Sequence, residues 1–362
     1  GALDKESLDR ALAGKNLQVK FKVAEDKFYF IGRCAKGEIE TLLQLLYAHL
    51  TDPGFRRDAF LYSQERFDQR YRSLEKSING ALTLSGIRFL AGGDSRFGLP
   101  AREHIAHLTM DDVIRWIKPA ISQAPLELSV VGDFDPPATR ELIARYFGSL
   151  PNRKPLAVAS RDNRPVFPAG KTLEADIRTR LPKGLTVVAY PTADTWDIKR
   201  TRRLAVLAEV ISERLRIGIR EKLGAAYSTA AFNRPARAYE GYGVLMIYIQ
   251  VAPEKVTVIR DAVHQIIRTL VSEGITEDEL QRALDPTLSG IRDARRRNSY
   301  WLDVVLAGSR EHPAQLAWSR DIIADYSAIT VPEIETLARE YLVDERAADI
   351  LVTSLKTGAG DK

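Results

Sequence analysis

Apolar residues recur at every third or fourth position along the stretch that ends near residue 222. They are Leu204, Leu207, Ile211, Leu215 and Ile219. This spacing places them on one face of a helix, which we predict over residues 195–222. Gly224 follows and is predicted to end the helix, because glycine accepts the left-handed backbone of a C-cap without a Cβ clash.

The same patterns predict the other elements. Helical spacing predicts helices at 37–50, 56–76, 79–91, 109–121, 136–147, 254–273, 276–307 and 314–326, and one that opens at Thr330. Short apolar or alternating runs predict strands at 18–22, 27–33, 126–131, 171–180, 184–190, 226–233, 240–251 and 348–354. This alternation predicts an α+β fold of antiparallel sheets, each with helices packed on one face.

A segment at 151–170 separates two such groups of elements. It contains four prolines, two basic clusters and no apolar periodicity, which is typical of a linker. We therefore predict a first domain at 1–150 and a second at 171–362.

The two predicted domains share landmarks in the same order. Thr109 and Thr330 each open a helix and stand 221 positions apart, while Ala35 and Ala252 precede apolar helices and stand 217 apart. A nearly constant offset predicts a duplicated domain of about 220 residues. Under this offset, the strand pair and long helix at 171–222 have no counterpart in the first domain, so we expect that domain to lack its first strands and helix.

Composition limits the class of protein. With 362 residues, 45% hydrophobic and 28% charged, the chain is an ordinary globular sequence without an apolar run of the roughly 20 residues that a membrane span needs. No signal peptide is visible at its start, and Cys34, the one cysteine, permits no internal disulfide.

The net charge of +5 raises the question of nucleic acid. The dense basic runs at 199–203 and 292–297 lie within helical patterns, and no ribonucleoprotein or zinc-finger motif is present. We therefore expect no nucleic-acid partner. A preference for acidic peptides is an equal alternative.

The junction between the long helix and the following strand is the candidate site. Arg220 lies on the last helical turn and Tyr227 at the start of the strand, which brings a guanidinium and a phenol to one corner. The same residues also have ordinary structural explanations: a cation complements the helix dipole, and an aromatic ring at a strand start often packs in the core.

Several motifs resemble the pitrilysin/insulinase (inverzincin) zinc peptidases. The run from Arg220 to Ser228 is similar to the arginine-to-tyrosine signature in their C-terminal half. Further similar segments are 51–55, 96–100, 130–135 and 146–151; segments 42–47 and 298–302 are most similar to the PqqL-like bacterial zinc proteases. The resemblance implies a metallopeptidase LuxS/MPP-like fold and identifies the domains as the third and fourth of four, the third non-catalytic and the fourth in contact with substrate.

The family's zinc motif is missing. No H-x-x-E-H occurs; the histidines are His49, His104, His107, His264 and His312. Arg72 stands where the resemblance places a further zinc-binding glutamate, and arginine cannot bind zinc. The resemblance thus implies that zinc binds in the N-terminal half of the intact protein, that this chain carries no metal and no catalytic residue, and that it is inactive alone.

The expected function is that of the half of a zinc metallopeptidase that holds no zinc. It would enclose the substrate chamber and assist peptide binding through Arg220 and Tyr227. Its partners would be the peptide substrate and the N-terminal catalytic half, and the resemblance implies a periplasmic location. The alternative is a non-catalytic partner subunit that presents peptides to a separate catalytic chain.

Overall fold

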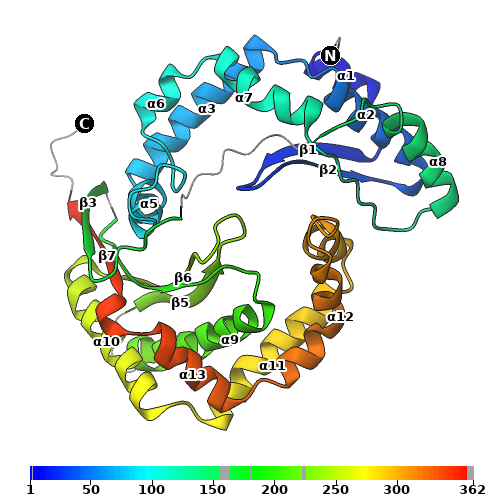
Figure 1. Cartoon of the computed structure of the whole chain (residues 1–362). Helices are drawn as coiled ribbons and strands as arrows, with labels where there is room; N and C mark the ends of the chain where they lie inside the picture. Colours follow the sequence, from blue (N-terminus) through cyan, green and yellow to red (C-terminus); the bar gives the residue numbers. More distant parts are fainter. Residues whose placement is uncertain (2, 155–163, 180, 222–225, 357–362) are drawn as a thin grey trace. The chain divides into compact units, whose positions relative to one another are not determined.

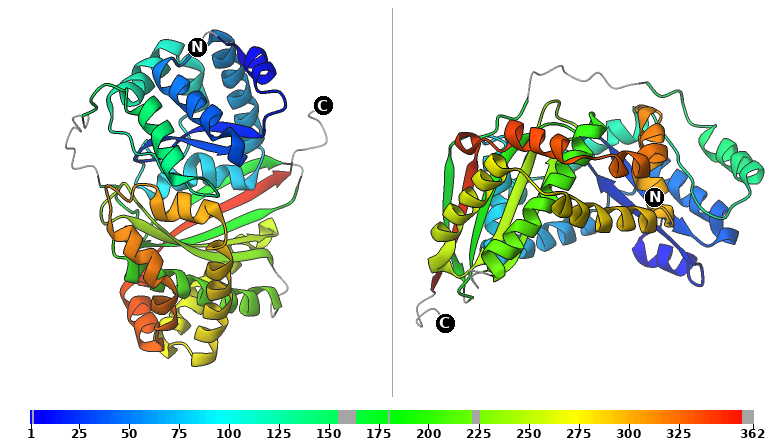
Figure 2. Two further views of the ribbon diagram at one scale, coloured as in Figure 1. Left: turned by 90° about the vertical axis from the view of Figure 1, so that its right-hand side faces the viewer. Right: turned by 90° about the horizontal axis from the view of Figure 1, so that it is seen from below.

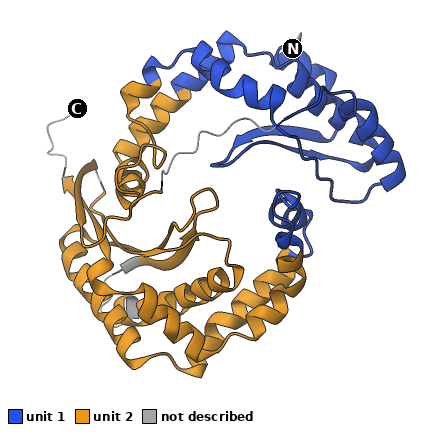
Figure 3. Ribbon diagram, in the orientation of Figure 1, with its two compact units in different colours: residues 1–65, 106–161, 295–316 blue, residues 66–105, 162–294, 317–362 orange. Residues whose placement is uncertain are grey.

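The computed structural model describes residues 1, 3–154, 164–179, 181–221 and 226–356; for residues 220, 221, 226 and 227 it describes the main chain only. The chain forms two compact units (Figure 3). Unit 1 comprises residues 1–65, 106–161 and 295–316, and unit 2 comprises residues 66–105, 162–294 and 317–362. Each unit is therefore assembled from segments of both predicted domains. The prediction of domains at 1–150 and 171–362 concerns the duplicated halves and stays a prediction.

Unit 2 contains a five-stranded sheet (Figure 1). Its strands are β3 (Thr172–Thr179), β4 (Gly184–Thr192), β5 (Ala226–Pro235), β6 (Gly243–Val251) and β7 (Ala348–Lys356), in the order β3-β7-β4-β6-β5. Neighbouring strands are antiparallel except β3 and β7, which are parallel. The prediction of a purely antiparallel sheet is wrong at this pair. Since β3 and β4 run in opposite directions and β7 inserts between them, β7 must be parallel to one of them.

Helices α9 (Ile198–Leu215), α10 (Val256–Glu273) and α13 (Val331–Tyr341) lie against one face of this sheet (Figures 1 and 2). Helix α11 (Glu277–Ala294) packs on α9, and α12 (Ala314–Ser327) joins the same apolar cluster through Tyr326. Helix α9 begins at its N-cap Asp197, whose carboxylate accepts a hydrogen bond from the Arg200 amide. All five residues of the apolar period that predicted this helix are buried, so the periodicity identified the core-facing side correctly.

The opposite face of the sheet is covered as well. Residues of α4 (Ile78–Ala81), the π-helical turn η2 (Leu82–Gly86) and α5 (Ile87–Leu90) pack against Leu185 and Met246 in a second apolar cluster. Helices therefore lie on both faces, where one was expected. The α+β class is confirmed, and the second layer exists because β4 is apolar at nearly every position rather than at alternate ones.

Unit 1 contains a two-stranded antiparallel sheet, β1 (Leu17–Val23) and β2 (Phe28–Cys34). Other elements of residues 1–150 are α1 (Lys5–Ala11), the 3-10 turn η1 (Lys36–Glu38), α2 (Ile39–Thr51), α3 (Arg57–Glu75), α6 (Arg102–His107), α7 (Met110–Gln123) and α8 (Pro136–Phe147). The chain passes from one unit to the other within α3 and between Ile105 and Ala106 in α6. A Cβ added to Gly32 would lie 2.8 Å from Leu42 Cδ1, so the glycine allows β2 to approach α2 closely.

Two expected elements differ from the structure. Residues 126–131 form no strand, because a strand needs a neighbour to complete its hydrogen bonds, and only β1 and β2 pair among the described residues of unit 1. The helix expected at 276–307 ends with α11 at Ala294, and a separate π-helical segment, η5 (Tyr300–Leu306), follows.

The structure adds landmarks to the internal repeat. The π-helical turns η2 and η5 begin at Leu82 and Tyr300, which stand 218 positions apart. Capping boxes form at both Thr109 and Thr330. The 3-10 turns η1 and η4 (Pro253–Lys255) also correspond. These matches agree with two homologous halves. Residues 66–105 of the first half belong to unit 2, and the corresponding residues 295–316 of the second half belong to unit 1.

Candidate functional site

The predicted corner lies where α9 ends and β5 begins. Helix α9 continues into a π-helical turn, η3 (Arg216–Glu221), which contains the main chain of Arg220, while Tyr227 belongs to β5. The predicted C-cap Gly224 lies outside the described residues, as do the side chains of Arg220 and Tyr227. The prediction that the guanidinium and the phenol meet at this corner therefore stays a prediction.

The main chain is irregular on both sides of this corner. In η3 each turn holds more residues than in an α-helix, and Gly218 lets it pack closely, since a Cβ there would lie 3.0 Å from Ile266 Cδ1. The pairing of β5 with β6 shifts register between Ala226 and Ser228, which places a β-bulge at Tyr227. Both irregularities are common where a protein must direct a side chain toward a functional site.

Ser212 joins α9 to β5. Its hydroxyl accepts a hydrogen bond from the Ala231 amide at 2.8 Å and donates one to the Ala231 carbonyl at 3.2 Å. These contacts satisfy main-chain groups at the outer edge of β5. They hold the last turns of the helix against the strand that leads from the corner.

Arg214 holds the end of α9 from the opposite side. Its guanidinium forms two bonds to the Glu279 carboxylate, at 2.7 and 3.0 Å, and donates to the Gly274 carbonyl at 2.7 Å. The hydrogen bonds from Arg214 lower the pKa of Glu279 below its ordinary value. A planar two-point contact of this kind fixes orientation as well as distance.

The start of α9 is held by a buried charge cluster. Arg202 and Arg203 bond the two oxygens of Asp325 at 2.7 and 3.1 Å, and Arg203 also bonds Glu333 at 2.8 Å. Burial acts to raise the pKa of Asp325, but the hydrogen bonds from the two arginines outweigh it, so the pKa is lowered. Helix α9 is thus fixed at both ends.

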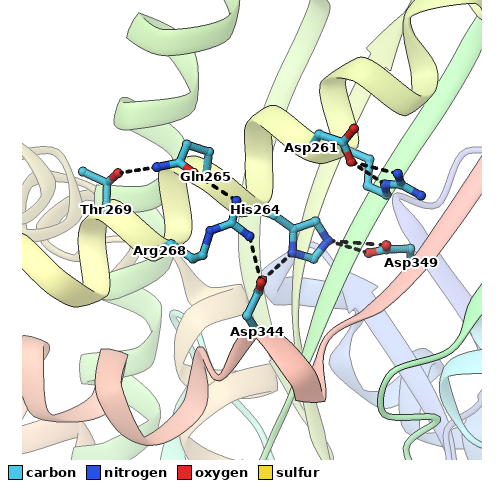
Figure 4. Close-up of polar contacts among 8 residues, drawn as sticks. Asp261, His264, Gln265, Arg268, Thr269, Asp344 and Asp349 are labelled. Carbon is cyan, nitrogen blue, oxygen red and sulfur yellow. Dashed lines mark hydrogen bonds and ion pairs between the residues drawn. The ribbon is translucent and has the colours of Figure 1, made fainter.

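A second polar cluster in unit 2 centres on His264 (Figure 4). The imidazole Nδ1 lies 2.6 Å from Asp344 Oδ1, and Nε2 lies 3.1 Å from Asp349 Oδ1. Arg268 bonds the other oxygen of Asp344 at 2.8 Å. Only a protonated imidazole can donate to both carboxylates, and these bonds, first that to Asp349, raise the pKa of His264. No local pattern in the sequence predicts this cluster, because the aspartates lie 80 and 85 residues from the histidine.

The side chains that the structure describes do not fit a zinc ion. Arg72, at the position expected for a zinc-binding glutamate, pairs with Asp68 at 2.8 Å. Asp68 is also bonded by Arg102, and this hydrogen bond is the main cause of its lowered pKa. No group of three or more histidine, cysteine, aspartate or glutamate side chains in the described part of the chain could hold a metal. Among the described helices, none is long and apolar enough to cross a bilayer.

Comparisons with known proteins agree with the motifs. Residues 107–286 match the family described as Peptidase M16 inactive domain. The chain is 24% identical over 358 residues to the chloroplastic stromal processing peptidase of Arabidopsis thaliana, and 23% identical over 351 residues to that of Pisum sativum. It covers 28% of the length of each, so it spans less than a third of these relatives.

Solved structures share the fold. The peptidase M16 inactive domain from Pseudomonas fluorescens superimposes with a TM-score of 0.82 at 16% identity, over 99% of this chain and 85% of that chain. A protease from Helicobacter pylori gives 0.80 at 15% identity, over 98% and 86%. The periplasmic protease PqqL from Escherichia coli gives 0.77 at 16% identity, over 98% and 39%. The resemblance to pitrilysin/insulinase peptidases is confirmed: residues 107–286 match the peptidase M16 family in the part described as its inactive domain, and the solved relatives of like fold include peptidases of that family.

Proposed function

We propose that this chain is the half of a zinc metallopeptidase that holds no zinc and that contacts the peptide substrate. The observation that carries the proposal is the match to an inactive peptidase domain in a sequence without H-x-x-E-H. In the intact protein, zinc and the catalytic base belong to an N-terminal catalytic half. Together the two halves enclose a chamber in which peptides are hydrolysed.

Arg220 and Tyr227 are the substrate-binding residues of this proposal. A guanidinium offers a rigid fork of donors to a peptide carbonyl or carboxylate, and a phenol can donate to an oxyanion as charge develops on it. The π-helical turn and the β-bulge at their main-chain positions support such a role. So do Ser212 and Arg214, which hold the end of α9 on two sides.

One structural relative supports a periplasmic location, because PqqL is described as a periplasmic protease. A second candidate function is that of a separate partner subunit that presents peptides to a catalytic chain. Its supporting observation is chain length, because this chain covers 86% of the solved Helicobacter pylori protease chain but 28% of the Arabidopsis thaliana peptidase. The reading frame upstream of Gly1 distinguishes them: an in-frame H-x-x-E-H supports one polypeptide, and a stop codon close upstream supports a partner subunit.

Tyr227→Phe in the assembled enzyme tests the catalytic assistance. It removes only a hydroxyl, so we expect turnover to fall by about 10- to 1000-fold, with a smaller change in peptide affinity and little change in melting temperature. Arg220→Lys should also lower turnover, since lysine keeps the charge but loses the planar fork. Steady-state kinetics on a quenched fluorescent peptide measures both.

Tyr326→Phe is the matched control. It removes a hydroxyl from a tyrosine buried in the same unit, and turnover should stay at the level of the unchanged enzyme. Normal turnover in the Tyr227→Phe enzyme would contradict the proposed role.

A further inference from the structure

One face of the two-stranded sheet in unit 1 is positively charged. In the register of β1 and β2, Gln18 is opposite Arg33, Lys20 opposite Ile31, and Lys22 opposite Tyr29, so these six side chains share a face. The side chains of Lys20, Lys22 and Arg33 are exposed. We call this surface the basic face. The other face holds Phe21 and Phe30, whose rings lie 5.0 Å apart.

The acidic groups near the basic face do not neutralise it. The structure gives Lys20, Lys22 and Arg33 no ion pair with any residue that it describes. Asp133 pairs with Lys36 at 2.8 Å, and Glu38 accepts a hydrogen bond from the Asn16 amide at 3.0 Å. Glu25 and Asp26 lie in the turn beyond the strands. Three positive charges therefore remain available on this face.

The equivalent face of unit 2 has the opposite character. At an offset of 217, Tyr29, Ile31 and Arg33 correspond to Met246, Tyr248 and Gln250 of β6. Met246 is buried in the cluster formed with residues 78–91, and Tyr248 and Gln250 both bond the Asn79 side chain. An apolar segment thus covers that face. It could not cover the basic face at low cost, because burying an unpaired cation is strongly unfavourable. A partner for the basic face has to bring negative charge, which a peptide supplies through carboxylates.

The spacing of the charges specifies the shape of that partner. Alternate side chains of a strand stand about 6.6–6.8 Å apart, and so do those of an extended peptide. Lys20 and Lys22 can therefore each meet one of two carboxylates placed at alternate positions. Arg33 lies opposite Gln18 at the end of the ribbon, on the same face as the two lysines, and can meet a third carboxylate.

We propose that the basic face binds extended acidic peptide segments that carry carboxylates at alternate positions. The inference rests on the proposed role of the chain as a peptide-binding half, and it names a substrate class for that role. The contacts are charge-assisted and lie at the surface, so affinity should fall as salt is raised.

Fluorescence anisotropy on the full 362-residue chain tests the proposal. The probes are three labelled nonapeptides: one with glutamate at alternate positions, an isomer with the same glutamates clustered at one end, and one with glutamine in their place. We expect the alternating peptide to bind about tenfold more tightly than either of the others at low salt, since exposed ion pairs are individually weak but three act together. In Lys20→Glu/Lys22→Glu/Arg33→Glu protein this preference should disappear.

The matched control is Lys76→Glu/Lys255→Glu/Arg292→Glu, which makes the same charge change at three exposed positions elsewhere. It should retain the preference. If the glutamate variant has a lowered melting temperature, replacement of Lys20, Lys22 and Arg33 by glutamine provides a milder variant for the same test. The proposal would be overturned if the alternating and clustered peptides bound equally well, or if both triple variants lost the same amount of affinity. The lysines would then serve only to keep an edge strand from pairing with other chains.

This outcome is separate from failure of the proposed function. Suppose that the assembled enzyme cleaves neutral peptides, that Tyr227→Phe slows this cleavage, and that acidic peptides do not bind the basic face. Only the inference about the basic face then fails. If acidic peptides bind the basic face but the assembled enzyme shows no dependence on Tyr227, the catalytic assistance fails instead.

Discussion

The two sheets of this molecule differ in what they bury. In unit 2, β4 is buried at every position except Pro191, and both clusters of buried apolar residues belong to that unit. In unit 1, β1 has no fully buried residue, and Phe21 and Val23 are exposed at 38% and 49%. The two sheets therefore serve different purposes. Apolar burial is concentrated in unit 2, while unit 1 presents polar and aromatic surface.

The largest expected effect is the loss of stability when one core leucine in each unit is replaced by alanine. Leu207→Ala removes a side chain with 0% exposure from the core of unit 2 and should lower the free energy of unfolding by about 3–5 kcal/mol. Leu42→Ala in unit 1, where the side chain is 9% exposed, should cost about 2 kcal/mol, because the smaller core leaves less of a cavity. Urea unfolding followed by circular dichroism measures both. Equal losses would show that the two units are packed alike.

The next effect is a pH dependence that comes from His264 in unit 2. The His264 imidazolium is bonded on both sides, so its pKa in the folded chain is raised above the unfolded value of about 6.5. Its stabilisation is fully present below that unfolded value and is lost as pH rises through the raised pKa of the folded state. We expect the free energy of unfolding to fall on the alkaline side by about 2 kcal/mol, the scale of hydrogen bonds to charged groups.

Unfolding curves from pH 6 to 9 check this expectation. His264→Gln should flatten the decline, and His104→Gln, at an exposed position, should leave it unchanged. An unaltered slope in the His264→Gln chain would assign the pH dependence to other groups.

The smallest expected effect compares two equivalent asparagines. The side-chain oxygen Oδ1 of Asn79 accepts hydrogen bonds from both Tyr248 and Gln250 in unit 2. Asn79→Ala should therefore cost about 1 kcal/mol. Asn298, which stands 219 positions later in unit 1, should tolerate alanine within about 0.5 kcal/mol, as surface positions usually do. The melting temperatures of the two variants measure this difference. Equal decreases in melting temperature would show that the two asparagines contribute alike.

Local patterns in the sequence predicted much of the fold. The apolar period of α9 identifies its buried side, and the threonines at 109 and 330 identify two helix starts, each of which forms a capping box in the structure. The strands expected at 18–22 and 27–33 are present as β1 and β2, because local alternation predicts each of them.

The remaining features depend on residues far apart in the sequence. No local pattern encodes the insertion of β7 between β3 and β4 or the contact of residues 78–90 with the unit 2 sheet. The bonding of His264 to Asp344 and Asp349 likewise depends on residues far apart in the chain. The same limit explains the strand expected at 126–131. Its residues have strand propensity, but propensity does not supply a neighbouring strand.

The exchange of equivalent segments between the units has a consequence for how such a chain can evolve. A recombination that moved residues 171–362 into another gene would leave behind residues 78–90, which cover Leu185, Val187 and Met246. The transplanted sheet would then expose an apolar face to water, and a face of that kind promotes aggregation. Selection should therefore remove crossovers within 151–170. We therefore expect the two halves of the repeat to be inherited together, across the predicted linker at 151–170.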